Sequence, residues 1–296
     1  MKRINRSLML AFLITGIGAP ALLAQSTGGP AGQTAGVPAN QTTGDTAGQS
    51  DAEEDGPGRG VARISLMNGD VSVRRGDSGD WVAAAINGPL MAEDRVLTGP
   101  GARAEIQLNY YNRVRLAGDA EVRFPGLEWH KYQIQVASGT IEFAALPGTN
   151  DQIEFATPAA SLRPLAAGSY RITVLGGGGV EFTVRRGEAD IYTPKGSRHL
   201  TPGRTMRVHL AEDNVPEFQL TAEIARDAFD EFNSRRDQEL SQVKSYQHMS
   251  RDIEGGEDLD GAGEWVDQQP YGYSWRPHVA PDWAPYQDGR WMWEDY

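Results

Sequence analysis

The 296-residue sequence contains no cysteine. This absence excludes disulfide bonds, Cys-ligated zinc, iron–sulfur clusters, a thiol nucleophile and a lipoprotein anchor on an acylated cysteine. The sequence also lacks a basic excess, because 28 Lys and Arg residues stand against 40 Asp and Glu residues. The resulting charge of −12 argues against a nucleic-acid-binding protein, which needs a positive surface to displace the counterions of phosphate groups.

Long hydrophobic runs are absent after residue 23. Before it, Lys2, Arg3 and Arg6 precede an uncharged apolar run from Leu8 to Leu23, which is followed by Ala24-Gln25-Ser26. This order is typical of a secretory signal peptide over residues 1–26. An uncleaved anchor is the alternative, but the run is shorter than the ~20 residues that span a membrane. We therefore expect a periplasmic or secreted protein that has no membrane span once the signal is cleaved.

Residues 27–60 consist mainly of Gly, Thr, Ala, Gln and Pro, with a few acidic residues. Val37 is the one large aliphatic residue of this segment, which has no aromatic residue. Such a composition cannot bury enough apolar surface to offset the entropy of ordering the chain. We expect a disordered linker that acts as a spacer and holds no site.

Residues 61–210 show short runs of alternating apolar and polar residues, broken by glycine. This pattern predicts an all-β domain, and a glycine-containing turn between two alternating runs favours a β-hairpin. Three such units centre on Asn68-Gly69, Ser138-Gly139 and Arg186-Gly187. A second echo links Leu97-Thr98-Gly99-Pro100-Gly101 to Leu200-Thr201-Pro202-Gly203. The echoes indicate either internal repeats or the chance similarity of turns in a glycine-rich β protein.

Several stretches of this β region resemble the FecR domain family. They are Ala102-Arg-Ala-Glu-Ile-Gln-Leu-Asn, Arg113-Val-Arg-Leu-Ala, Ile134-Gln-Val-Ala-Ser-Gly-Thr, Phe155-Ala-Thr-Pro-Ala, Gly168-Ser-Tyr-Arg-Ile-Thr-Val and Val184-Arg-Arg-Gly-Glu-Ala. The resemblance covers roughly residues 61–210 and implies a sandwich-like or solenoid-like domain of short strands turned by glycine. The family takes its name from the extracytoplasmic part of a ferric-citrate sigma regulator. Those regulators carry an anti-sigma segment before their membrane helix, whereas only Met1–Ser7 precede the apolar run here, so a direct anti-sigma role is not expected.

A helical segment is predicted over residues 211–255. Within it, residues 218–251 are expected to form one amphipathic helix that packs on the β core. Apolar residues recur near the helical period of 3.6, with charged residues between them. These apolar residues are Leu220, Ile224, Phe229, Phe232, Leu240 and Val243. On the strands, the carboxylates Glu105, Glu142, Glu154 and Glu181 alternate with apolar residues and are expected to face solvent.

Residues 256–296 form an acidic tail in which we expect irregular structure. Five of the seven tryptophans lie there, with several tyrosines and prolines. The segment is similar to the C-terminal Trp/Pro/Tyr repeats of an uncharacterised group of exported FecR-domain proteins, and by that likeness it ends early at Tyr296. Tryptophan and tyrosine combine apolar area with a polar group, which suits a binding surface. The predicted interaction residues are Trp265, Tyr271, Tyr273, Trp275, Trp283, Tyr286, Trp291 and Trp293.

No pattern in the sequence points to catalysis, a cofactor or a metal. The stretch Asp258-x-Asp260-Gly261 hints at a calcium loop but lacks its third acidic position and its closing glutamate. The five histidines are scattered without a pair at ligand spacing. We therefore predict a non-enzymatic extracytoplasmic binding or sensing adaptor with an envelope protein as partner. The alternative is a module that binds cell-wall glycan through the aromatic tail, and packing of these aromatic residues into a small core is an equally open interpretation.

Overall fold

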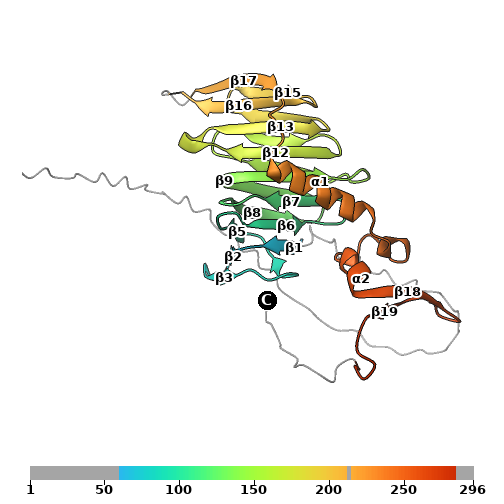
Figure 1. Cartoon of the computed structure of the whole chain (residues 1–296). Helices are drawn as coiled ribbons and strands as arrows, with labels where there is room; N and C mark the ends of the chain where they lie inside the picture. Colours follow the sequence, from blue (N-terminus) through green and yellow to red (C-terminus); the bar gives the residue numbers. More distant parts are fainter. Residues whose placement is uncertain (1–59, 212–214, 285–296) are drawn as a thin grey trace, which may run out of the picture. The chain divides into compact units, whose positions relative to one another are not determined.

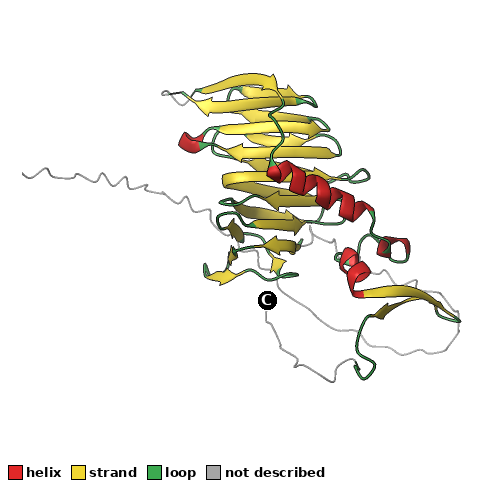
Figure 2. Ribbon diagram, in the orientation of Figure 1, coloured by secondary structure: helices red, strands yellow, loops and turns green. Residues whose placement is uncertain are grey.

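The computed structural model describes residues 60–211 and 215–284. The signal peptide, the linker up to residue 59 and the tail residues from 285 onward, which include Tyr286, Trp291 and Trp293, lie outside the described residues. Two β-sheets face each other, and the apolar side chains between them form the core. The strands and helices that build this arrangement are seen in Figures 1 and 2. The all-β prediction for this region is confirmed.

The first sheet, called sheet A, includes the first half of β9. Its pairings are antiparallel except for the parallel pair β9–β10. In order across the sheet the strands are β3 (Trp81–Ala83), β2 (Val71–Arg74), β5 (Arg95–Thr98), β8 (Glu121–Glu128), β9 (Lys131–Ala145), β10 (Gln152–Ala156), β11 (Ser161–Pro164), β14 (Ala189–Thr193) and β15 (Gly196–Leu200).

The second sheet, called sheet B, includes the second half of β9 and is antiparallel throughout. Since β9 runs through both sheets, it joins them covalently. In order across the sheet the strands are β4 (Pro89–Leu90), β1 (Ala62–Asn68), β6 (Arg103–Gln107), β7 (Asn112–Leu116), β9, β12 (Gly168–Val174), β13 (Val180–Arg186), β16 (Arg204–Leu210) and β17 (Pro216–Ala222).

The three glycine turns predicted as hairpins are corners between the sheets, so that prediction is wrong. Strand β1 pairs with β4 and β6, whereas β2, after Gly69, pairs with β3 and β5. At Gly139 the strand β9 passes from sheet A to sheet B, and at Gly187 the chain passes from β13 to β14. All three glycines have positive φ, of 81°, 76° and 84° respectively. A corner and a hairpin both need a residue that can adopt a positive φ. Only the identity of the strands that pair on either side distinguishes the two.

The two similar glycine-containing stretches at residues 97–101 and 200–203 have the same geometry. Gly101, with φ 72°, lies at the corner from β5 to β6, and Gly203, with φ 73°, lies at the corner from β15 to β16. In each case the chain leaves sheet A and enters sheet B. The echo therefore reflects equivalent corners of one architecture.

The segment predicted as one helix is shorter and begins later. Residues 216–222 form β17, which extends sheet B beyond residue 210, so Leu220 belongs to a strand. Helix α1 (Ala228–Ser241) begins after Asp227, and the 3₁₀ turn η2 (Ser245–Gln247) follows it. A second 3₁₀ turn, η1 (Gly176–Gly178), lies between β12 and β13. Helix α1 lies across the outer face of sheet B (Figure 1).

The described part of the tail is more regular than expected. Helix α2 (Gly256–Ala262) leads into strand β18 (Gly263–Gln268), which pairs with β19 (Gly272–Pro277) in an antiparallel hairpin. In the residues that the structure describes, no helix is long and apolar enough to span a membrane.

The corner glycines give a test of the fold. A Cβ at Gly139 would lie 2.5 Å from Cα of Ala120, whereas a Cβ at the exposed Gly177, with φ 80°, would meet nothing within 4 Å. Gly177→Ala should lower the free energy of unfolding by about 1 kcal/mol, the cost of the left-handed conformation. Gly139→Ala should lower the free energy of unfolding by about 1–3 kcal/mol more than Gly177→Ala does, because the backbone at the corner must move. Urea denaturation measures both losses, and equal losses would contradict this packing of the corners.

Candidate functional site

The outer face of sheet B carries a row of charged residues of alternating sign. Glu105 on β6 lies opposite Arg115 on β7, which lies opposite Glu142 on β9, which lies opposite Arg171 on β12. Their chain neighbours, such as Ile106 and Ala104, point into the core. Opposite charges at directly paired positions attract each other across the strands, so the row supports the strand register.

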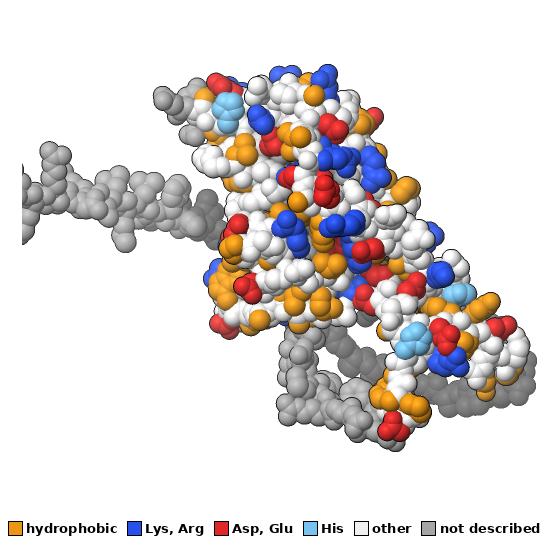
Figure 3. Space-filling model, in the orientation of Figure 1, with side chains coloured by type: hydrophobic (Ala, Val, Ile, Leu, Met, Phe, Trp, Pro, Cys, Tyr) orange, Lys and Arg blue, Asp and Glu red, His pale blue; other side chains and the backbone are white. Residues whose placement is uncertain are grey.

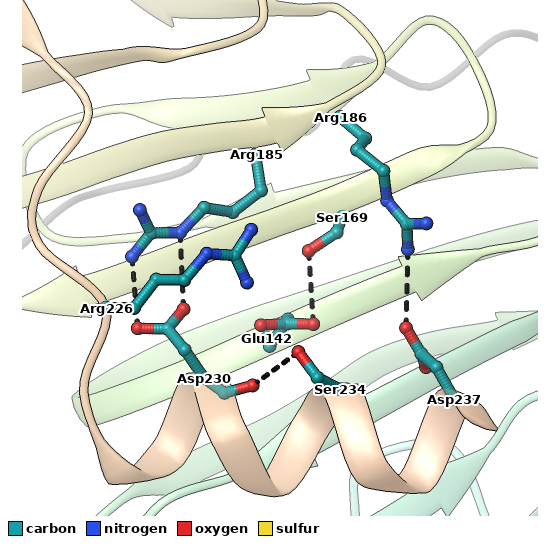
Figure 4. A pocket seen from close by; sticks show the side chains of 8 residues that line it. All are labelled: Glu142, Ser169, Arg185, Arg186, Arg226, Asp230, Ser234 and Asp237. Carbon is teal, nitrogen blue, oxygen red and sulfur yellow. Dashed lines mark hydrogen bonds and ion pairs between the residues drawn. The ribbon is translucent and has the colours of Figure 1, made fainter. Parts of the chain in front are cut away.

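The first half of helix α1 covers this row. Asp227 caps the helix, and its side chain accepts hydrogen bonds from the backbone N–H groups of Phe229 and Asp230. The carboxylate of Asp230 forms ion pairs with Arg171 at 2.8 Å and with Arg185 at 3.0 Å. Figure 4 shows Asp230 reaching up from the helix to Arg185 on the sheet.

The middle and end of α1 continue these contacts. The Nδ2 group of Asn233 donates to Glu142 at 2.8 Å. Arg236 pairs with Glu105 at 3.0 Å, and Asp237 pairs with Arg115 at 2.7 Å. Basic and acidic side chains accordingly lie side by side on the face that carries the helix (Figure 3).

Helix α1 therefore docks through polar and charged side chains, which differs from the expected apolar face. Of the predicted apolar residues, Phe229 is buried, Phe232 and Leu240 are half-buried, and Leu220 on β17 is 54% exposed. Arg103 and Arg171 each place a guanidinium group over the ring of Phe229. The helix thus fits a charged sheet face rather than an apolar one.

The strand carboxylates predicted to face solvent are mostly buried, which corrects that expectation. Glu105 and Glu142 lie under α1 with exposures of 0% and 3%. Glu181 is covered by Arg207, whose Nε donates to it at 2.6 Å. Glu154, on the outer face of sheet A, keeps partial exposure and pairs with Arg163. Alternation identifies the side chains that point away from the core, but it does not show whether another element covers them.

The two carboxylates under α1 have opposite pKa shifts. Burial disfavours the charged form of Glu105, but Arg115 and Arg236 outweigh this effect and lower its pKa to about 2. Burial raises the pKa of Glu142 to about 7, since Arg115 opposes the shift only in part and Asp237 adds to it. Glu142 accepts hydrogen bonds from the neutral donors Ser169 and Asn233, whereas Glu105 contacts guanidinium groups.

A cavity of about 220 Å³ lies beside Glu142, between α1 and sheet B (Figure 4). Its lining is polar, and its carboxylates Asp230 and Asp237 are both ion-paired. The lining residues are Glu142, Ser169, Arg185, Arg186, Arg226, Asp230, Ser234 and Asp237. Glu142 is the one member whose pKa is raised to near neutrality. This arrangement is an ion-pair network that holds the helix, with one group that titrates close to pH 7.

The tail is anchored to the same sheet by its acidic residues. Glu257 on α2 pairs with Arg63 at 2.9 Å and with Arg113 at 3.3 Å, and Asp258 pairs with Arg63 at 2.7 Å. Asp260 accepts hydrogen bonds from the backbone N–H groups that precede and begin η2. The residues of the supposed calcium loop thus make contacts within the chain, and the described residues contain no group of three or more ligands suited to a metal ion.

Four of the predicted interaction residues lie on the β18–β19 hairpin, namely Trp265, Tyr271, Tyr273 and Trp275. Trp265 and Trp275 are directly paired across the two strands. The Nε1 group of Trp265 donates to Ser245 Oγ at 2.9 Å, and that of Trp275 donates to the carbonyl of Leu259 at 3.2 Å. Each tryptophan is therefore held against the segment that connects α1 to the hairpin.

The tyrosines of the hairpin are more exposed. The ring of His248 lies against Trp265 and Tyr273, with centroid separations of 5.1 and 4.3 Å. Tyr271 is 81% exposed and Tyr273 is 59% exposed, while Trp283, beyond the hairpin, is 45% exposed. By strand alternation Tyr273 lies on the same face of the hairpin as Trp265 and Trp275, so the more exposed rings of Tyr273 and Tyr271 lie toward the turn of the hairpin.

Comparison with known protein families matches two parts of the chain. Residues 94–190 match the family described as FecR protein, so the chain carries a FecR-family domain. Residues 256–296 match a family of unknown function (DUF6600). A search of curated proteins found no match.

Among solved structures, two crystal structures of a protein described as "a putative anti-sigma factor from Parabacteroides distasonis ATCC 8503" are similar to part of the chain. Both are 16% identical, with a TM-score of 0.38. The similarity covers 44% of this chain and 60% of that protein.

The raised pKa of Glu142 predicts a pH-dependent stability. In the unfolded chain this carboxyl group ionises near its ordinary value of 4.5, and in the folded chain near 7. The folded state then holds one more proton between these values, so stability falls as pH rises through this window. Glu142→Gln removes the titration. Relative to this variant, the free energy of unfolding of the native chain should fall by roughly 3 kcal/mol between pH 4.5 and 7.

Urea denaturation at half-unit pH steps measures this difference. Glu239→Gln is the matched control, since the Glu239 side chain is 63% exposed at the same helix. Parallel stability curves for the native chain and Glu142→Gln would show that Glu142 ionises in the folded state as it does in water.

Proposed function

We propose that this chain, whose residues 94–190 match the FecR family, is an exported non-enzymatic adaptor that binds a protein partner in the bacterial envelope. The family match supports a role in signalling or sensing. Export rests on the signal-peptide pattern of residues 1–26, with a periplasmic or secreted location.

The observation that carries this proposal is the exposure of two tyrosines toward the turn of the β18–β19 hairpin. Tyr271 and Tyr273 present large rings with hydroxyl groups to solvent. Tyrosine and tryptophan are the residue types that most often supply binding energy at protein interfaces. Because Trp265 and Trp275 are held by hydrogen bonds to η2 and α2, the hairpin is ordered before a partner binds. Preordered surfaces lose less conformational entropy on binding.

The hairpin also has free strand edges in the described part of the chain. Among the described strands, β18 and β19 pair with each other and with no further strand. An extended peptide can add to such an edge by main-chain hydrogen bonds, with alternate side chains placed against the aromatic rings. A protein partner could therefore use both the edge and the rings.

Substitution of the two exposed tyrosines tests this proposal. We expect the Tyr271→Ser, Tyr273→Ser double variant to lose a crosslinked species that the native chain forms in the envelope of its own host. The matched control is Trp129→Ser, because Trp129 is 61% exposed and lies in the turn between β8 and β9. The control should keep the species. Equal recovery with all three proteins, or recovery with none, would contradict a protein partner at the hairpin.

Glycan binding is the second candidate, and it rests on the exposed rings of Tyr271 and Trp283. Aromatic rings can stack on the apolar faces of sugars. Titration of peptidoglycan fragments or polysaccharides, followed by tryptophan fluorescence, separates the two candidates. A saturable response that Trp283→Ala or Trp275→Ala removes would favour the glycan, and an unchanged signal would eliminate it.

A further inference from the structure

A second cavity, of about 530 Å³, lies between the end of α1, the η2 turn and strands β7 and β9. Neither the family matches nor the proposed adaptor role assigns a function to it. Its lining combines four arginines with apolar and aromatic side chains. The arginines are Arg113, Arg115, Arg186 and Arg251.

Two arginines that line this cavity each have a buried guanidinium donor without a hydrogen-bond acceptor among the described residues. Arg115 is 0% exposed; its Nε donates to Glu105, and its Nη1 donates to the carbonyl of Asn233 and pairs with Asp237. Its Nη2 is buried without a hydrogen-bond partner in the described part of the chain. Nε of Arg113 is also buried without a hydrogen bond there, although it forms an ion pair with Glu105 at 3.9 Å. An unsatisfied buried donor costs about 1–3 kcal/mol, more when it is charged, so these groups point to an acceptor that enters the cavity.

The other two arginines lie where the cavity meets solvent. The side chain of Arg186 is 69% exposed and pairs with Asp237 at 3.3 Å. The guanidinium group of Arg251 lies 5.0 Å from the ring centroid of Tyr110. Donors at the mouth and in the interior could thus contact the same ligand.

The charges that face this cavity favour an anion. Asp237 is the one acidic residue of the lining, and Arg115 and Arg186 both pair with it. Glu105 and Glu257 contact the inner arginines but do not line the cavity. The lining therefore carries four positive charges against one negative charge.

The remaining wall is apolar or aromatic. Helix α1 and the segment after it contribute Leu240 and Val243, and the end of β9 contributes Ala144, followed by Leu146. Tyr110 and Tyr246 stack edge to face, with centroids 4.6 Å apart. Such a wall suits the apolar body of a ligand rather than a small hydrated ion.

We propose that this cavity binds a small organic anion, whose carboxylate or phosphate group contacts Arg115 and Arg113 and whose apolar or aromatic body lies against Leu240, Val243 and the two tyrosines. The planar fork of a guanidinium group matches the oxygen pair of a carboxylate or a phosphate. The site is distinct from the exposed tyrosines of the hairpin, so the proposal does not depend on the adaptor role.

Isothermal titration of the whole chain with benzoate and phenyl phosphate tests the site. Benzyl alcohol, which has the ring without the charge, and inorganic phosphate, which has the charge without the ring, are the matched probes. We expect benzoate or phenyl phosphate to bind at least about tenfold more tightly than either matched probe. Benzyl alcohol lacks a charge-assisted hydrogen bond and inorganic phosphate lacks the burial of the ring, and each of these contributions corresponds to at least about that factor.

Two variants locate the binding. The Arg186→Ala, Arg251→Ala double variant should weaken binding of the better probe about tenfold or more, and both residues are at the surface, so the fold is retained. Val243→Asp should weaken it as well, because it places a carboxylate in the apolar wall. Arg204→Ala, at an exposed arginine of β16, is the control and should leave binding unchanged.

Three results would overturn the proposal. The first is the absence of saturable binding by both aromatic anions, which would mean that solvent alone satisfies the buried donors. The second is equal binding of inorganic phosphate, which would remove the apolar body from the recognition. The third is tight binding that neither the double variant nor Val243→Asp changes, which would place the anion elsewhere on the chain.

Discussion

The buried ion pairs between helix α1 and the outer face of sheet B are the interaction on which the rest of the structure depends. Helix α1 removes the charged row Glu105, Arg115, Glu142 and Arg171 from water. Pairs within the row, such as Glu105 with Arg115, compensate this loss in part, and the helix must supply further partners of the right charge. The helix residues Asp230, Asn233, Arg236 and Asp237 supply these partners. Such pairs add little net stability compared with an apolar interface, but they accept only one position of the helix, because a shifted helix would leave charges unpaired.

This single position of α1 determines the path of the chain after the helix. The segment after α1 returns to the sheet, where Glu257 reaches Arg63 and Arg113 and positions α2. From α2 the chain enters the hairpin, whose tryptophans bond back to the connecting segment. The arginine-lined cavity lies between α1, this segment and the sheet. The aromatic surface and the cavity therefore both depend on the charged contacts under the helix.

The sequence predicted the all-β class and its glycine positions, because alternation and turn residues are local signals. It did not separate corners from hairpins at Gly139, since both need a positive φ and differ only in which distant strand is the partner. It placed Glu105 and Glu142 in solvent, because alternation does not show that a helix covers the outer face. The start of α1 was within reach, since Asp227 and Asp230 form a capping box that marks a helix beginning at residue 228.

A double-mutant cycle between Arg171 and Asp230 tests the central claim most directly, because this pair lies 2.8 Å apart across the helix–sheet interface and is almost fully buried. The free energies of unfolding of the native chain, Arg171→Ala, Asp230→Ala and the double variant give the coupling energy. A helix positioned by buried ion pairs predicts a favourable coupling of about 2 kcal/mol. A coupling below about 0.5 kcal/mol, as for pairs at an exposed surface, would contradict the claim that these charges hold the helix.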